Sequence, residues 1–539
     1  MRLRGFLPIP ILAVLVGFQL DCSLIVQSGG VQCETTIDCV NHGFPADAIC
    51  TADKICVGPS VGSCANNAQC IAQNGGKASI CSRASGSPVC VPVLTKECTQ
   101  TFGPIERDDA IVFGSVLSLT GVNASTGVAS LNGSLLAQEE IANTVVGLPP
   151  TEGGKPPRPI AIVSCDDLSD GTVAQRAAQH LVDLGVPAIM GPAFSGLCNS
   201  VANNVTIPKK TLLISASATS AALSGISPYF WRTSPSDVFQ AIPLEKSINE
   251  MEDAYKTKYA LPQTTKIKLA IGYKDDSYGQ GLYNTITKTL KLNGFPIADP
   301  SNATLFKPTQ YAAAAPDQAK LVSDLVAFLP NVVALFGTNE TVSAIMTKLE
   351  AAWPSANTTR PLYLFADGGE VPELLDACKG NDGLRTRIRG SVPGAKSALF
   401  NQFSIRYNGK FSKSADIFGA AGSYDSVYLL AYAIATLGTK PVDGTGISTG
   451  LTAMVGGTKV EVGPANIKAA FATLGTAGGK IDIDGASGPL NFDLTLHEAP
   501  SDIDMWCVGK DGGGNPTFLS SGRFYDSGQA TMVGTYSCP

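Results

Sequence analysis

The sequence predicts an α/β protein of two lobes, each built on a parallel β-sheet, with a small disulfide-rich module in front of them. Two observations predict this arrangement. Ten of the 15 cysteines lie between Cys22 and Cys98, and from about Ala110 short apolar runs alternate with helical segments in two successive series. Such alternation is typical of parallel sheets with helices on both faces, because parallel strands must be joined by crossovers.

Composition and charge exclude several classes of protein. The chain has 539 residues with 39 basic and 45 acidic side chains, a formal net charge of −6, and no basic run. Neither nucleic acid nor an anionic membrane surface is therefore an expected partner. The apolar content of 44% excludes a disordered chain. After the first 26 residues, no apolar stretch reaches the roughly 18 residues of a membrane-spanning helix.

The N-terminus predicts export. Arg2 and Arg4 precede the apolar run FLPIPILAVLVGF, which is too short to span a bilayer and has the length of a signal-peptide core. Residues 1–21 are therefore predicted to be a signal peptide. The next cysteine, in QLDC, resembles the lipidated first residue of bacterial lipoproteins, which predicts lipidation of Cys22 and membrane contact through a lipid anchor only. The alternative is that Cys22 is an ordinary disulfide partner.

Residues 22–98 are predicted to be a module held by disulfides. Two units, 33–56 and 64–90, have cysteine gaps of five, ten and five residues, and of five, ten and eight residues. Turn-rich segments without apolar periodicity separate these cysteines, so cross-links must hold the units. Zinc is the competing interpretation, but the spacing of zinc ligands is absent and the chain has only 3 histidines. No metal is predicted, and the connectivity within the module stays open.

The two α/β series can be placed along the chain. Strands of the first series are expected at 111–117, 160–164, 187–190 and 212–215, with helices over 172–184 and from Ser195. The second series begins near residue 266, and its remaining elements are strands at 332–336, 361–365 and 388–392 and helices at 280–293, 317–328, 340–352 and 424–438.

An enzymatic function is the weakest hypothesis. The motif GISTG at 446–450 precedes His497, with Asp482, Asp484 and Asp493 between them, which is the order of an α/β-hydrolase. A nucleophile elbow needs an apolar strand before the serine, whereas TKPVDGT is a loop. We therefore interpret the motif as a surface loop and predict no catalytic residue and no cofactor.

Hydroxyl side chains follow two neighbouring strands of the first series. Ser195 follows the strand at 187–190, and Ser217, Thr219 and Ser220 follow the strand at 212–215. Free N–H groups at helix N-termini, flanked by hydroxyls, are natural carboxylate sites. The alternative is that each residue is a helix N-cap. Because two such ends lie at one edge of a sheet, the sequence supports a binding site as well as it supports the N-cap interpretation.

Several stretches resemble the type I periplasmic binding proteins, specifically the leucine/isoleucine/valine-binding branch. They cover about residues 110–440 in the order VFGSVLSLTG, LNGSLLAQEEIAN, LVDLGVPAIMGPAFSG, TLLISASATSAAL, YKDDSYGQG and YDSVYLLAYAI. The resemblance implies two Rossmann-like lobes joined by three crossovers within residues 109–539. Lobe 1 is expected at about 109–237 plus 393–460, and lobe 2 at about 238–392 plus the C-terminal segment.

The resemblance also implies an amino-acid site between the lobes. Ser195, Ser217 and Thr219 would hold the carboxylate, Tyr278 would close over the ligand from the second lobe, and Asp367 would face the ammonium. Glu370 is the alternative for that last role. Asp425 is expected to be a structural or hinge carboxylate, and Thr338 and Asn339 stand where the family has a second aromatic residue.

The leading functional hypothesis is an extracytoplasmic protein, in the periplasm or at the cell surface, that delivers an amino-acid-like ligand to an ABC permease. The alternative is a surface-anchored sensor with the same fold and no transporter. In either case the protein is not an enzyme.

Two disulfides are predicted in the lobes. Cys507 and Cys538 have no other late partner, and Cys165 and Cys198 follow adjacent strands, so each pair is expected to bond. Elimination leaves Cys98 with Cys378.

Overall fold

The computed structural model describes residues 64–313, 315–394 and 397–538, together with residues 35, 38, 49–50 and 56–57. The predicted signal peptide and Cys22 lie outside this part of the chain. The chain divides after residue 61 into two units. In the first, β1 (Ile49–Cys50) pairs with β2 (Cys56–Val57), and Cys50 lies opposite Cys56. Within the described residues, no helix has the length and apolarity needed to cross a membrane.

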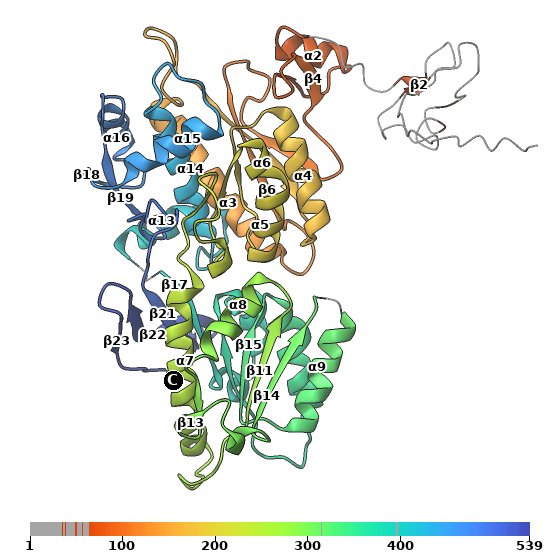
Figure 1. Cartoon of the computed structure of the whole chain (residues 1–539), viewed down its shortest axis with the longest axis vertical. Coiled ribbons are helices and arrows are strands. Elements are labelled where there is room, and N and C mark those ends of the chain that lie inside the picture. Colours follow the sequence, from red (N-terminus) through yellow and green to blue (C-terminus); the bar gives the residue numbers. More distant parts are fainter. Residues whose placement is uncertain are drawn as a thin grey trace, which may run out of the picture. The chain divides into compact units, whose positions relative to one another are not determined.

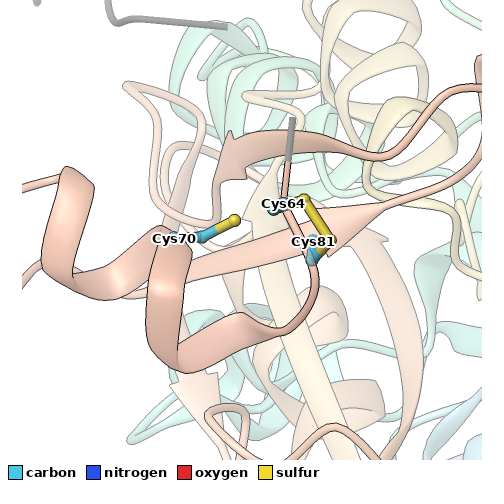
Figure 2. Close-up of side chains that lie close together, drawn as sticks. All are labelled: Cys64, Cys70 and Cys81. Carbon is cyan, nitrogen blue, oxygen red and sulfur yellow. A yellow bond between two sulfur atoms is a disulfide. The ribbon is translucent and has the colours of Figure 1, made fainter. Parts of the chain in front are cut away.

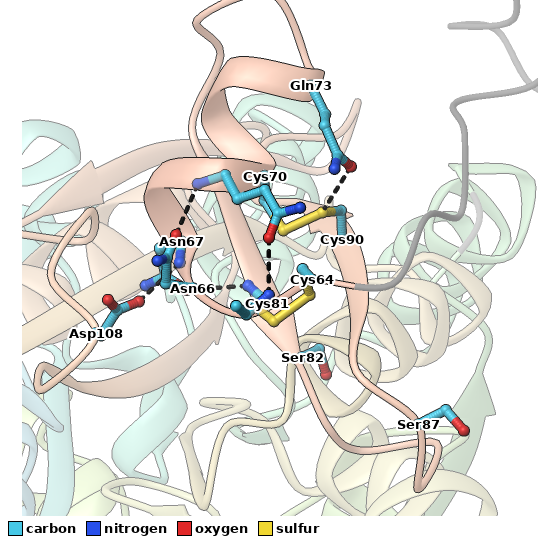
Figure 3. Close-up of a disulfide and its surroundings, with 12 residues drawn as sticks. Cys64, Asn66, Asn67, Cys70, Gln73, Cys81, Ser82, Ser87, Cys90 and Asp108 are labelled. Atoms are coloured by element: carbon cyan, nitrogen blue, oxygen red, sulfur yellow. Dashed lines mark hydrogen bonds between the residues drawn. A yellow bond between two sulfur atoms is a disulfide. The ribbon is translucent and has the colours of Figure 1, made fainter.

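The second unit begins with a small cross-linked motif. It consists of α2 (Asn67–Gln73), β3 (Ser79–Ser82) and β4 (Val89–Pro92), and its interleaved disulfides join Cys64 to Cys81 and Cys70 to Cys90 (Figure 3). Cys81 lies opposite Cys90, the same register as in the first unit, which agrees with an internal repeat.

The zinc interpretation does not hold for this motif. The sulfurs of Cys64, Cys70 and Cys81 lie within 4.8 Å of one another (Figure 2). Each sulfur belongs to a disulfide, however, whereas zinc binds thiolates.

This motif packs on the first lobe. Ile80 and Val93 belong to a core cluster of that lobe, and the Ser82 hydroxyl donates to the Asp183 carbonyl at 2.6 Å. The segment that follows, β5 (Cys98–Phe102), pairs antiparallel with β7 (Ile160–Asp166). The expected module boundary at residue 98 therefore falls at the start of a strand of the first lobe's sheet.

The first sheet has the order β10-β9-β8-β6-β7-β5 and is parallel except for β5. Helices α3 (Ala124–Val145) and α14 (Ala420–Ala435) cover one face, and α4 (Gly171–Leu184) and α5 (Ser195–Val201) cover the other (Figure 1). The remaining strands are β6 (Ile111–Leu117), β8 (Ala188–Met190), β9 (Leu212–Ser215) and β10 (Phe230–Arg232).

Local sequence explains these helices. Asp170 caps α4 by accepting from the N–H groups of Thr172 and Val173, and Gly185 ends the helix in the left-handed conformation. Every residue of α14 is buried, which requires the continuous apolar character seen in its sequence. Between α5 and β9 lie the π-helix η1 (Ala202–Thr206) and the short α6 (Ile207–Lys209).

The second sheet has the order β14-β11-β15-β16-β17-β21-β22-β23. It is parallel from β14 to β17 and antiparallel from there onward, so it is mixed. Its strands are β11 (Leu269–Lys274), β14 (Phe306–Tyr311), β15 (Val332–Phe336), β16 (Leu362–Phe365), β17 (Ile388–Pro393), β21 (Ile503–Lys510), β22 (Pro516–Asp526) and β23 (Thr531–Gly534).

Helices and short elements complete the second lobe. They are α7 (Asp237–Lys258), α8 (Ser277–Ile286), β12 (Lys291–Leu292), β13 (Phe295–Pro296), α9 (Ala315–Phe328), η4 (Thr341–Met346), α10 (Thr347–Ala352), η5 (Asp367–Gly369), α11 (Pro372–Cys378) and α12 (Asp382–Arg385).

The chain crosses between the lobes three times: after β10, after β17 and before β21. Between the second and third crossings lie α13 (Ala398–Phe411), α15 (Gly444–Leu451), β18 (Thr458–Glu461), α16 (Ile467–Leu474), β19 (Ile481–Gly485) and β20 (Gly488–Pro489).

The first lobe extends further than the expected limit of about 460. Ile481, Leu490 and Ala499 belong to the same core cluster as α14, because α16 and β19 cover the outer side of that helix. Asp425, expected to be structural, is buried and accepts from the N–H groups of Ala486 and Ser487. It therefore holds the segment that leads to the third crossing.

Two of the three expected lobe disulfides are corrected. Cys165 bonds to Cys98, not to Cys198, because the unpredicted strand β5 places Cys98 directly opposite it. Cys198 and Cys378 are buried free cysteines, and burial raises the pKa of each thiol to about 12. The expected disulfide between Cys507 and Cys538 is present.

Candidate functional site

A cavity lies between the two lobes, and we call it the ligand chamber. From the first lobe, its lining residues are Thr126, Ala193, Phe194, Ser195, Ser217 and Phe418. From the second lobe, they are Asp276, Tyr278, Thr338, Asp367, Gly368, Glu370 and Val371. Four of the five expected binding residues thus line one cavity, and Thr219 is the exception.

The hydroxyls of the first lobe are set by the ends of two neighbouring strands. Ser195 opens α5, and its Oγ accepts from the Ser220 N–H at 3.1 Å. The Ser217 hydroxyl donates to the Ala193 carbonyl at 2.9 Å. Thr219 is buried behind this wall, and its carbonyl accepts from the Asp237 N–H at 2.7 Å. The backbone at Thr219 therefore connects the loop that carries Ser217 to the start of α7.

Tyr278 and Asp367 meet inside the second lobe's wall. Tyr278 follows the N-cap Asp276 at the start of α8, and Asp367 follows β16. The Tyr278 hydroxyl donates to Asp367 Oδ1 at 2.6 Å and accepts from the Gly368 N–H at 3.2 Å. The two residues come from different elements, so their contact fixes the shape of this wall.

The electrostatics of the ligand chamber favour a positive group. Three carboxylates, Asp276, Asp367 and Glu370, line it, and none of the described lining residues is a lysine or an arginine. Burial raises the pKa of Asp367 to about 6, against the lowering effect of the hydrogen bond from Tyr278. Asp237, buried nearby, has a pKa well above its usual range because of burial and the charge of Asp367. A cationic group placed in the chamber would relieve this crowding of carboxyl groups.

Thr338 stands where the family resemblance implies an aromatic residue. Its hydroxyl donates to Glu340, and it accepts from Lys274 Nζ at 3.1 Å. Lys274 Nζ also lies 3.8 Å from both Asp276 Oδ2 and Glu340 Oε1. This part of the wall is therefore polar and held by an ion-pair network, rather than aromatic.

Arg232 is a positioning residue that the sequence reasoning missed. Its buried guanidinium donates to the carbonyls of Ala218 and Ser220, at 2.9 and 2.8 Å, and pairs with Glu498. It therefore fixes the loop that carries Ser217 and Thr219. The sequence feature that could have indicated this role is an arginine within the apolar strand FWR, because a buried charge must have a partner.

The lobes touch along the chamber. The Ser220 hydroxyl donates to the Ser277 carbonyl at 2.7 Å, and Asn339 Nδ2 donates to the Val122 carbonyl at 2.8 Å. These bonds join the first-lobe loops directly to the start of α8 and to the segment after β15. The structure therefore shows a closed cleft.

The hydrolase hypothesis is not supported by the geometry. The GISTG serine, Ser448, lies within α15, and its hydroxyl donates to the Pro228 carbonyl at 2.5 Å. His497 packs against the Trp231 ring, with centroids 4.9 Å apart. The serine therefore lies inside a helix rather than at a strand-to-helix elbow.

Two α/β lobes joined by three crossovers, with a polar cavity between them, define a two-lobed protein that closes around a ligand. The family model described as "Periplasmic binding protein" matches residues 110–498, more than half of the chain. The chain therefore belongs to the periplasmic binding protein family. Among curated proteins, none matches the sequence significantly.

Solved structures share this fold. The branched-chain amino acid transporter substrate binding protein LivJ from Streptococcus pneumoniae, in complex with isoleucine, is 20% identical over 76% of this chain and 99% of its own, with a TM-score of 0.56. The leucine binding protein LivK from Thermotoga maritima is 19% identical over 76% and 98%, with a TM-score of 0.55.

A third similar structure binds a different kind of ligand. The solute binding protein of an ABC transporter from Rhodopseudomonas palustris, in complex with 3,4-dihydroxy benzoic acid, is 18% identical over 78% of this chain and 98% of its own, with a TM-score of 0.56. At these identities the likeness shows the fold alone.

Proposed function

We propose that this protein captures an amino acid, or a similar small zwitterion, between its lobes and delivers it to an ABC permease. The observation that carries the proposal is the division of the ligand chamber's polar groups. Hydroxyls at two strand ends lie on the first lobe, and carboxylates with a tyrosine lie on the second. A zwitterion needs donors at one end and an anionic partner at the other, because both charges lose their hydration in a closed cleft.

The proposed roles follow this division. Ser195 and Ser217 bind the ligand's carboxylate, and Thr219 supports their loop from behind. Asp367 binds the ammonium, with Glu370 as the second carboxylate within the chamber. Tyr278 orients Asp367 and closes over the ligand from the second lobe.

The proposed location is outside the cytoplasm, with attachment to the membrane through a lipid on Cys22. Four disulfides among the described residues support an oxidising compartment. Replacing Cys22 by Ser should release the protein into the soluble fraction, and unchanged fractionation would rule out the lipid anchor.

Calorimetric titration with the standard amino acids tests the proposed ligand class. An amino acid should bind the wild-type protein, and Asp367→Asn should weaken that binding by about 2–5 kcal/mol, because it leaves the ammonium without its charged partner. Glu370→Gln is the matched control on the neighbouring carboxylate, and it should weaken binding by less than Asp367→Asn does.

Two outcomes would overturn parts of this proposal. Equal binding by Asp367→Asn and a larger loss in Glu370→Gln would transfer the ammonium role to Glu370. Binding of no amino acid at all would remove the amino-acid proposal and favour a sensor of another ligand.

A further inference from the structure

The second lobe carries a pocket at the end of its sheet that faces away from the ligand chamber, and we call it the basic pocket. Its charged lining consists of Lys258, Glu350, Arg360 and Arg387. Arg360 and Arg387 lie just before β16 and β17, whereas Asp367 of the ligand chamber follows β16. The length of β16, about 13 Å at the rise of a parallel strand, therefore separates the basic pocket from the ligand chamber.

Glu350, the carboxylate among the described lining residues, already has several bonds. Arg387 donates to both of its oxygens, at 2.8 and 2.6 Å. Arg360 Nη1 and the Tyr363 hydroxyl also donate to Glu350, at 2.8 and 2.7 Å. Although burial acts to raise the pKa of Glu350, the bonds from Arg387 hold it below its ordinary value. Glu350 is therefore ionised and balances one cation, which leaves the described lining with an excess of two positive charges.

Lys258 and Arg360 have donors that the described residues do not use. Lys258 Nζ donates to the Thr386 hydroxyl at 3.3 Å and forms no ion pair with a described residue. Arg360 donates from Nη1, so its Nε and Nη2 groups have no partner in the described part of the chain. Partial burial, together with the charge of Arg387, lowers the pKa of Lys258. An anion beside Lys258 would oppose this effect, because it stabilises the ammonium form.

We infer that the basic pocket binds a small oxyanion with two negative charges, such as inorganic sulfate or phosphate. The anion's oxygens accept from Lys258 Nζ and from the unused N–H groups of Arg360, and its charge balances the excess that Glu350 leaves. Charge-assisted hydrogen bonds from guanidinium and ammonium groups to such anions are among the stronger hydrogen bonds in proteins. A singly charged anion such as acetate leaves one positive charge unbalanced, so the site selects for a double charge.

Thermal unfolding and calorimetric titration of the purified protein test this inference. Sodium sulfate, phosphate and acetate are each added at about pH 8, where phosphate is doubly charged, with sodium chloride holding the ionic strength constant. An anion that binds only the folded protein raises its unfolding temperature. We expect sulfate and phosphate to bind about tenfold or more tightly than acetate.

Two variants locate the bound anion. Lys258→Met and Arg360→Gln each remove one positive charge from the basic pocket, and each should weaken sulfate and phosphate binding by about tenfold or more. Lys291→Met is the matched control, because Lys291 is exposed on β12 of the same lobe and is not among the described residues of the pocket lining. It should leave anion binding unchanged. Thermal unfolding without added anion checks that each variant is folded, and Lys258→Met decides if Arg360→Gln is not.

Three outcomes would overturn the inference. If sulfate and phosphate change the unfolding temperature no more than chloride does at equal ionic strength, no such site exists. Binding that is unchanged in Lys258→Met would place the anion elsewhere. If acetate binds as tightly as sulfate, the double charge is not recognised and the assigned class of anion is wrong. Amino-acid binding by Lys258→Met should equal that of the wild type, so none of these outcomes depends on the proposed function.

Discussion

At the scale of single residues, the sequence was most informative about side chains that follow strands. Ser195, Ser217, Tyr278 and Asp367 all come just after a strand or at the start of a helix, and the structure brings all four to one cavity. Thr219 was misplaced because its side chain turns into the protein, which spacing alone does not show. The sequence did not indicate that Phe418 lines the ligand chamber, because this residue follows no predicted strand and lies in a loop.

Binding of an amino acid should depend on pH through Asp367. Its pKa is raised to about 6 by burial, so the carboxylate that would bind an ammonium is lost as the pH falls through this value. Affinity should fall about fivefold between pH 6 and pH 5, and change little above pH 7. Burial and the charge of Asp367 raise the pKa of the neighbouring Asp237 well above its ordinary value.

Titration calorimetry from pH 5 to pH 8 measures this dependence. In Asp367→Asn the residual affinity should be nearly flat over the same range. A wild-type affinity that is constant down to pH 5 would show that the charge of Asp367 does not contribute to binding.

Removing the charge of Arg232 should destabilise the first lobe. The guanidinium is fully buried and paired with Glu498, so Arg232→Met leaves a buried carboxylate without its partner. The expected loss is about 3–5 kcal/mol in the free energy of unfolding, measured with denaturant. The double variant Arg232→Met with Glu498→Gln should recover part of it. A single variant as stable as the wild type would contradict this role.

At the scale of elements, the parallel strands were predictable and the antiparallel additions were not. The run IVFGSVL appears in the structure as β6 with the predicted bounds, and the apolar helix expected at 424–438 is α14 at 420–435. Strand β5, with the sequence CTQTF, is short and polar, because it lies at a sheet edge and pairs on one side only. Its position depends on partners that periodicity does not reveal, and the error in the pairing of Cys165 followed from it.

The disulfide that joins β5 to β7 should contribute to the stability of the first lobe. Cys98 and Cys165 are 67 residues apart, and their bond restricts the unfolded chain. Replacing both by Ala should lower the free energy of unfolding by about 2–5 kcal/mol, measured in denaturant under oxidising conditions.

Cys198→Ala is the control for this prediction, because Cys198 is a buried free thiol in the same lobe. Cys198→Ala should lower the free energy of unfolding by less than the double replacement does. Under reducing conditions the free energy of unfolding of the wild type should approach that of the double variant. Peptide mapping that joins Cys165 to Cys198 would contradict the pairing.

At the scale of the whole molecule, the proposed function requires that the bound ligand hold the two lobes together. Each lobe has its own core clusters, and the part of the chain that the structure describes crosses between them three times. A ligand stabilises the closed arrangement only by contacts that the open one lacks. Those contacts come from the second lobe if the first lobe, with its hydroxyl loops, receives the ligand first.

Tyr278 tests this order of events. It belongs to the second lobe, lines the ligand chamber, and follows Ser277, whose carbonyl accepts the bond from Ser220 across the cleft. Tyr278→Ala should therefore raise the dissociation rate of the bound amino acid by about tenfold or more, the equivalent of about 1.4 kcal/mol, and leave the association rate nearly unchanged. Tyr278→Phe keeps the ring and loses only the hydroxyl's bonds to Asp367 and from the Gly368 N–H, so its effect should be smaller. Tyr283→Ala is the matched control on the same helix, because Tyr283 stacks on Tyr273 and does not line the chamber.

Stopped-flow measurements separate the two rates. A slower association with an unchanged dissociation rate would mean that the second lobe receives the ligand first, and the assigned order of closure would then be reversed.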